Sequence, residues 1–195
     1  MHTNNQSLYE IETLVGEYLE YLARVRGLRP TTIRSYRGDL RQLQEFLAEH
    51  GHSTDVRNIA TREINLYASW LGRDRCPATV ARKLTALSGF FSHLVAMGYI
   101  DEDPVENIQR PKVRQPVVDI PSRQQCTQLL NACETERESA VLALLLGCGL
   151  RRGELLALDV SDIAAEFSQL TIRDGKGGTS RTVPIPDTTA ALLRR

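Results

Sequence analysis

Two short segments of the chain carry residues whose types and spacing suit the chemistry of phosphates. The first is GCGLRRGELLAL, residues 147–158, in which Arg151 follows two glycines and begins an expected helix. A guanidinium can bind a phosphate through two parallel hydrogen bonds, and free N–H groups at a helix start add a favourable dipole. The alternative is an exposed arginine ahead of an amphipathic helix, which is the commoner situation for a single arginine.

The second segment is TIRDGKGGTSRTVPIP, residues 171–186, in which Lys176 stands among three glycines. Glycines let the backbone of a tight turn come close to a ligand, so a lysine at this tip can carry its ammonium into a groove. There the ammonium could neutralise a phosphate or donate a proton to a leaving hydroxyl. A solvated lysine in a turn is the simpler alternative.

The elements that must position these two residues make up the second part of the chain. The pattern predicts helices at 122–133, 136–147 and 151–158, then strands at 169–173 and 181–185 that form a β-hairpin. The helix at 136–147 is almost entirely apolar, so we expect it to be buried. A last helix begins at Asp187 and has no C-terminal signal before Arg195, so we expect an incomplete domain.

The first part of the chain is expected to be helical throughout. Apolar residues recur at helical spacing in the ranges 8–25, 31–49, 55–72 and 77–97, followed by a short turn at 104–108. The segment RPKVRQPVVDIP, which starts at Arg110, holds three prolines and is expected to be a semi-rigid linker. We therefore predict a domain at 1–110, a linker at 111–121 and a second domain at 122–195.

Overall charge does not identify a partner, because 24 Lys and Arg balance 24 Asp and Glu. The distribution is uneven, however: residues 21–41 contain six arginines and one acid, Asp39. This segregation suits a protein with one basic face, although arginines on solvated helix faces would explain it equally well. The four cysteines form no C-x-x-C pair and no apolar run has membrane-spanning length, so we expect a soluble cytoplasmic protein without a metal.

Taken together and in this order, the motifs resemble those of the tyrosine recombinases of the phage-integrase and Xer type. TTIRSYRGDLRQLQEFL (31–47) and the stretch from Ala78 to Lys112 resemble the helical, SAM-like core-binding domain. GLRRGELLALDVSDI (149–163) and GKGGTSRTVPIP (175–186) resemble the start of the catalytic domain. The resemblance implies a mainly α fold: a SAM-like helical domain and the first part of an α+β catalytic domain with a β-hairpin.

The resemblance also implies roles for the two candidate residues. Arg151 matches the first catalytic arginine, which binds the scissile phosphate, and Lys176 matches the hairpin lysine, which protonates the departing 5′ hydroxyl. In this family a tyrosine attacks the phosphate and no metal or other cofactor is needed. The family's His-x-x-Arg pair and tyrosine nucleophile come later in the chain, whereas here the last histidine is His93 and the last tyrosine is Tyr99.

Two functions therefore remain open. One is an incomplete chain of an enzyme for site-specific DNA recombination, inactive by itself. The other is a non-catalytic DNA-binding protein that occupies or regulates a recombination site. Either way the resemblance implies double-stranded DNA as partner and further recombinase protomers on the DNA. The tail that links neighbouring protomers in the family is absent from this sequence, so we expect a monomer in solution.

The expected contacts to DNA are basic and hydroxyl residues on two helices and in the linker. Most of them should bind phosphates, which positions a protein on the duplex and reads little sequence. The candidates are Arg34, Arg37, Arg41, Thr79, Arg82, Lys83, Arg110 and Lys112.

Overall fold

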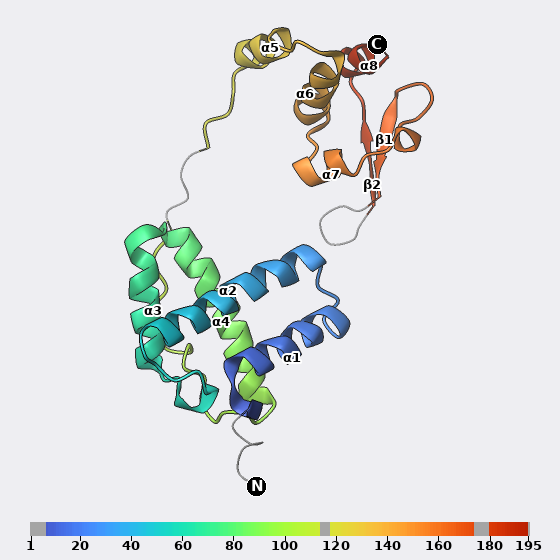
Figure 1. Cartoon of the computed structure of the whole chain (residues 1–195). Helices are drawn as coiled ribbons and strands as arrows, with labels where there is room; N and C mark the ends of the chain where they lie inside the picture. The colour runs from blue at the N-terminus through green and yellow to red at the C-terminus, as the bar shows by residue number, and fades with distance from the viewer. Residues whose placement is uncertain (1–6, 114–117, 174–179, 195) are drawn as a thin grey trace. The chain divides into compact units, whose positions relative to one another are not determined.

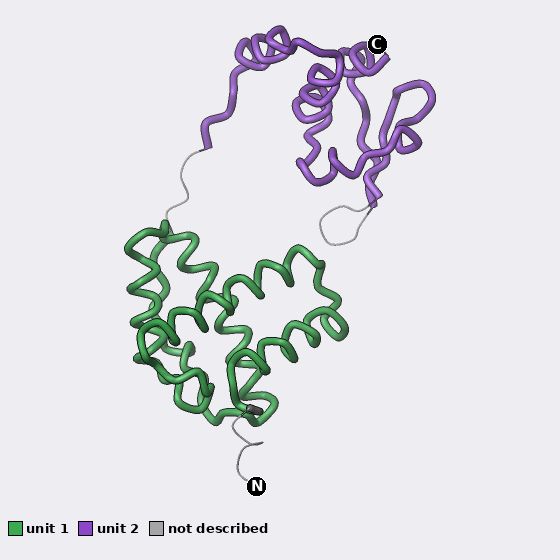
Figure 2. Tube along the Cα trace, viewed as in Figure 1, with its two compact units in different colours: residues 1–116 green, residues 117–195 purple. Residues whose placement is uncertain are grey.

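A computed structural model describes residues 7–113, 118–173 and 180–194 of the chain. The chain divides into two compact units, residues 1–116 and residues 117–195 (Figure 2). The break between them falls inside the proline-rich segment. Among the described residues, every helix is too short or too polar to cross a membrane.

The described part of unit 1 consists of four α-helices, labelled in Figure 1, and two short 3-10 turns. The elements are η1 (Ser7–Tyr9), α1 (Ile11–Arg24), α2 (Pro30–Glu49), η2 (Val56–Asn58), α3 (Thr61–Asp74) and α4 (Pro77–Ala96). Pro30 and Pro77 begin α2 and α4, where a missing N–H costs nothing because the first helical amides have no intrahelical partner. The helical architecture predicted for this part of the chain is confirmed.

The predicted helix at 55–72 is wrong in one respect, because it is divided into η2 and α3. In α3, Thr61 is the first helical residue and Ala60 occupies the cap position. The Glu63 carboxylate accepts the Ala60 N–H at 3.1 Å, which supplies one half of a capping box, while alanine cannot supply the other half.

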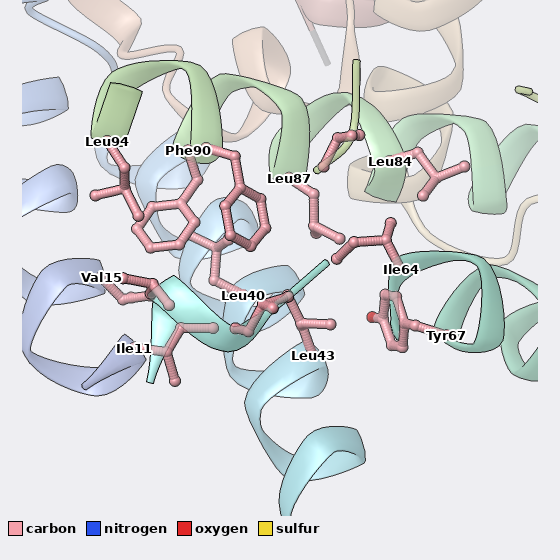
Figure 3. Close-up of a cluster of buried hydrophobic side chains, with 14 of the residues drawn as sticks. Ile11, Val15, Leu40, Leu43, Ile64, Tyr67, Leu84, Leu87, Phe90 and Leu94 are labelled. Carbon is pink, nitrogen blue, oxygen red and sulfur yellow. The ribbon is translucent and has the colours of Figure 1, made fainter. Parts of the chain in front are cut away.

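The core of unit 1 receives side chains from all four helices (Figure 3). Ile11 of α1, Leu43 of α2, Ile64 of α3 and Leu87 of α4 are fully buried there. Buried side chains of these helices are spaced three or four residues apart, as an amphipathic helix requires, so the opposite faces of α2 and α4 are left for polar side chains.

Unit 2 combines short helices with a two-stranded antiparallel sheet (Figure 1). The elements are α5 (Arg123–Asn131), α6 (Glu136–Cys148), α7 (Arg152–Leu156), η3 (Val160–Asp162), β1 (Gln169–Ile172), β2 (Arg181–Pro184) and α8 (Asp187–Leu193). The register pairs Gln169 with Pro184 and Ile172 with Arg181, which confirms the predicted hairpin. Ser122 and Gln125 form a reciprocal capping box at the start of α5, since they exchange side-chain-to-backbone hydrogen bonds.

The apolar helix α6 is less buried than its sequence predicts. Ala143 and Leu144 are buried, but Leu146 on the same helix is 40% exposed. The physical reason is that α6 contacts α5, α7 and α8, and among the described residues these contacts leave part of its surface, including Leu146, exposed. Gly147 allows α6 to approach α8 closely, because a Cβ there would lie 2.2 Å from the Thr189 Oγ1 of α8.

Candidate functional site

Arg151 stands at a sharp turn between α6 and α7. A reciprocal capping box between Thr135 and Glu138 starts α6, and Gly149 ends it with a φ of +62°, a left-handed conformation that favours glycine. The chain then turns through Leu150, which is buried in the core of unit 2, and Arg151 lies in an extended conformation at the cap of α7. The side chain of Arg151 is 60% exposed, so its guanidinium is accessible to a ligand.

Glu154 holds Arg151 in place from one turn further along the chain. Its carboxylate is nearly buried and accepts the backbone N–H of Arg151 at 2.9 Å and the Arg151 Nη1 at 2.8 Å. Arg181, the first residue of β2, donates to the same carboxylate from Nη1 at 2.7 Å and from Nη2 at 2.8 Å. Hydrogen bonds from the Arg181 guanidinium, followed by those from Arg151, hold the pKa of Glu154 far below its usual range.

The geometry corrects one part of the expectation for this site. The amide of Arg151 is not free for a phosphate, because Glu154 already accepts its hydrogen. The helix α7 has only five residues, so its dipole adds little. The group of Arg151 that stays accessible to an anion is its exposed guanidinium. The two guanidinium charges and one carboxylate charge of Arg151, Arg181 and Glu154 leave a net charge of +1.

A second arginine and carboxylate pair lies at the other strand of the hairpin. Arg173, directly after β1, forms an ion pair with the nearly buried Asp162 of η3 and donates to Ser161 Oγ at 3.1 Å. Arg173 and Arg181 therefore stand on either side of residues 174–179. Lys176 belongs to that segment and lies outside the described residues, so its expected approach to Arg151 stays a prediction.

Unit 1 presents the expected arginines of α2 on its surface. Arg34, Arg37 and Arg41 are all exposed. Arg41 is partly engaged, because its Nε donates to Glu45 at 2.8 Å one turn further along the helix. Arg110 and Lys112, which follow the helical part of unit 1, are exposed as well.

The three expected DNA contacts on α4, which are Thr79, Arg82 and Lys83, all have partners within unit 1. Arg82 is half-exposed and donates to both oxygens of the buried Asp39 carboxylate, at 2.5 and 2.8 Å. Lys83 is only 12% exposed, and its Nζ lies 2.7 Å from the same carboxylate. Burial alone would raise the pKa of Asp39, but the hydrogen bonds from Arg82 and Lys83 outweigh it, and the pKa is lowered. Thr79 is half-buried, with its hydroxyl 3.2 Å from the Cys76 thiol.

Three residues of these clusters were not identified from the sequence: Asp39 as an ion-pair centre, Glu154 and Arg181. The spacing of Arg151 and Glu154 is a signal that could have been used, because residues three apart on a helix face one another. No comparable signal exists for Arg181, which meets Glu154 across 27 positions of the chain. Within the described ranges, no group of three or more His, Cys, Asp or Glu side chains could hold a metal ion.

Comparison with known proteins gives matches in both units. Residues 15–98 match the N-terminal SAM-like domain of phage integrase, and residues 122–195 match the phage integrase family. A tyrosine recombinase of Pseudothermotoga lettingae is 31% identical over 187 residues, which are 94% of this chain and 65% of the relative. The tyrosine recombinase XerC of Erythrobacter litoralis is 35% identical, over 88% of this chain and 56% of the relative. The chain thus spans about two thirds or less of the length of these curated relatives.

Solved structures share the fold. A lambda integrase tetramer bound to a Holliday junction matches 94% of this chain and 55% of its own with a TM-score of 0.74 and 19% identity. The Tn1549 transposon integrase in complex with a circular intermediate DNA matches 96% of this chain and 64% of its own, also with a TM-score of 0.74, at 14% identity. At such identities the likeness concerns the fold alone.

Proposed function

We propose, from the premise that the chain belongs to the phage integrase family of tyrosine recombinases, that it binds duplex DNA and supplies part of a site for strand transesterification in site-specific recombination. Residues 1–110 bind the duplex, residues 111–121 connect the two domains, and residues 122–195 bind the phosphate at which the strand is exchanged.

The observation that carries the proposal is the state of Arg151. Its guanidinium is exposed, yet the buried Glu154 orients it, and the cluster keeps a net positive charge after the carboxylate is counted. Such a preorganised cation is suited to the charge that builds on the non-bridging oxygens of a phosphate during transesterification. Lys176 would complete this half of the site by protonating the departing 5′ hydroxyl.

The proposal assigns no nucleophile to residues 1–195. All six tyrosines precede residue 100 and belong to unit 1. Tyr18 and Tyr67 are buried in its core, and burial raises the pKa of Tyr18 to about 12. Tyr99 donates its hydroxyl to Glu17 at 2.9 Å. A covalent adduct between the chain and a nicked suicide duplex, detected by denaturing electrophoresis, would contradict this assignment.

Binding to DNA can be tested with the full chain and a fluorescein-labelled duplex by anisotropy at several salt concentrations. If about six phosphates are neutralised, the logarithm of the affinity should fall against the logarithm of salt with a slope of about −5. Arg151→Ala should bring the slope about 1 closer to zero. Arg137→Ala is the matched control, because Arg137 is also exposed but lies near the opposite end of α6. A slope near zero for the unaltered chain contradicts DNA binding, and equal slopes for the two variants contradict the role of Arg151.

A further inference from the structure

We propose that Arg181 is a positioning residue for Arg151: it holds the Glu154 carboxylate in a shared ion pair and so keeps the Arg151 guanidinium available for an anion. This inference rests on the proposed role of Arg151 in binding a phosphate. Arg181 is not expected to touch the phosphate itself.

The hydrogen bonds at the Glu154 carboxylate show that it binds Arg151 and Arg181 at the same time, and not one of them alone. Arg181 donates from two nitrogens to two different oxygens, at 2.7 and 2.8 Å, which is the bidentate arrangement of strong arginine–carboxylate pairs. Arg151 donates to the same two oxygens, one from its side chain and one from its backbone. Each carboxylate oxygen therefore accepts two hydrogen bonds, and the carboxylate cannot rotate without breaking contacts to both arginines.

The state of the Arg151 side chain follows from this sharing. Its Nη1 binds Glu154, while its Nε and Nη2 have no hydrogen-bond partner within the described parts of the chain. If Arg181 were neutral, the nearly buried carboxylate would have Arg151 as its one remaining cation. A buried carboxylate needs its lone pairs satisfied, so it would draw the remaining N–H groups of Arg151 inward. The charge of Arg151 would then be cancelled and its free donors lost.

The same contact joins Arg151 to the base of the hairpin. Arg181 pairs with Ile172 across the sheet, at the end of the ladder nearest residues 174–179. Arg173 directly follows β1 at this end, and its partner is Asp162 rather than Glu154. Both arginines thus tie the hairpin to a nearly buried carboxylate, but the Arg181 contact alone reaches Arg151. Arg173 is accordingly a matched control for the removal of a hairpin-base ion pair.

The first test is made without DNA. The Nε–Hε resonance of Arg151, assigned by its loss in Arg151→Ala, is followed by ¹⁵N NMR of the full chain. Arg181→Gln should shift this resonance and change the exchange rate of its proton, whereas Arg173→Gln should leave both unchanged. An Arg151 resonance unmoved by Arg181→Gln overturns the proposal. If Arg181→Gln fails to fold in thermal unfolding, the neutral variant Arg181→Met, which keeps much of the side-chain length, replaces it under the same criterion.

The second test is a double-mutant cycle on the fluorescein-labelled duplex. Arg181→Gln should weaken binding about tenfold, the size expected for one charge-assisted contact. The same substitution should have no further effect in the Arg151→Ala background, because Arg181 acts through Arg151. An equal loss in both backgrounds would make Arg181 a separate phosphate contact and overturn the proposal. If Arg151→Ala does not affect binding while Arg181→Gln still moves the Arg151 resonance, the proposed function fails and the positioning role stands.

Discussion

Asp39→Asn is expected to lower the stability of unit 1 substantially. The Asp39 carboxylate is 2% exposed and accepts hydrogen bonds from Arg82 and Lys83 of α4. An asparagine keeps the shape but leaves the Lys83 ammonium inside the protein without a counter-charge. Breaking a buried ion pair from one side costs about 3–5 kcal/mol, and the half-exposed Arg82 argues for the lower end. The expected loss is about 3 kcal/mol, or a fall in Tm of about 12 °C for a unit of this size.

Urea denaturation at neutral pH and at a series of lower pH values measures this effect. The folded-state pKa of Asp39 is below its unfolded-state value, so its contribution is fully present above the unfolded pKa, near 4. The contribution is lost as the pH falls through the lower folded pKa. The difference between the natural chain and Asp39→Asn should therefore shrink below about pH 4.

The matched control is Glu45→Gln, which breaks the exposed ion pair with Arg41 on the same helix. An exposed pair one helical turn apart contributes about 0.5 kcal/mol or less, so this variant should be nearly neutral. A loss below about 1 kcal/mol for Asp39→Asn, or one that does not change with pH, refutes the reasoning that the cluster is a buried, charge-balanced contact between α2 and α4.

Two further expectations concern the surface of unit 1 and the packing of unit 2. Arg34→Ala and Arg37→Ala should each bring the salt slope of duplex binding about 1 closer to zero. Both variants should leave Tm unchanged, because both side chains are exposed. A lowered Tm with an unchanged slope would mean that these arginines stabilise the fold and do not bind DNA. Gly147→Ala should destabilise unit 2 by about 1–3 kcal/mol, because the new Cβ meets Thr189 Oγ1 at 2.2 Å. Adding Thr189→Ala should restore much of that loss in the same urea titration, and an unrescued double variant would locate the strain elsewhere.

Local patterns in the sequence were sufficient for most elements of this protein, and the division of residues 55–72 into η2 and α3 is an exception. Apolar spacing, the prolines at the starts of α2 and α4, and the capping box at Ser122 each involve residues within one or two turns of one another. The glycines between two β-branched segments likewise predicted the hairpin. Arg151 could be identified as a candidate because it follows two glycines at the start of an expected helix, in a segment that resembles a family motif. In all of these cases the physical determinant and its consequence lie in the same short segment.

Tertiary structure decided which charges are available for a partner. Asp39 of α2 binds Arg82 and Lys83 of α4, which lie 43 and 44 positions away in the sequence. Lys83 therefore forms a contact between two helices, whereas Arg34 stays exposed. Glu154 meets Arg181 across 27 positions and so shares one carboxylate between two arginines. Sequence spacing cannot distinguish an exposed arginine from one that is held by a distant acid. That difference arises only when packing brings separate elements together and removes their carboxylates from water.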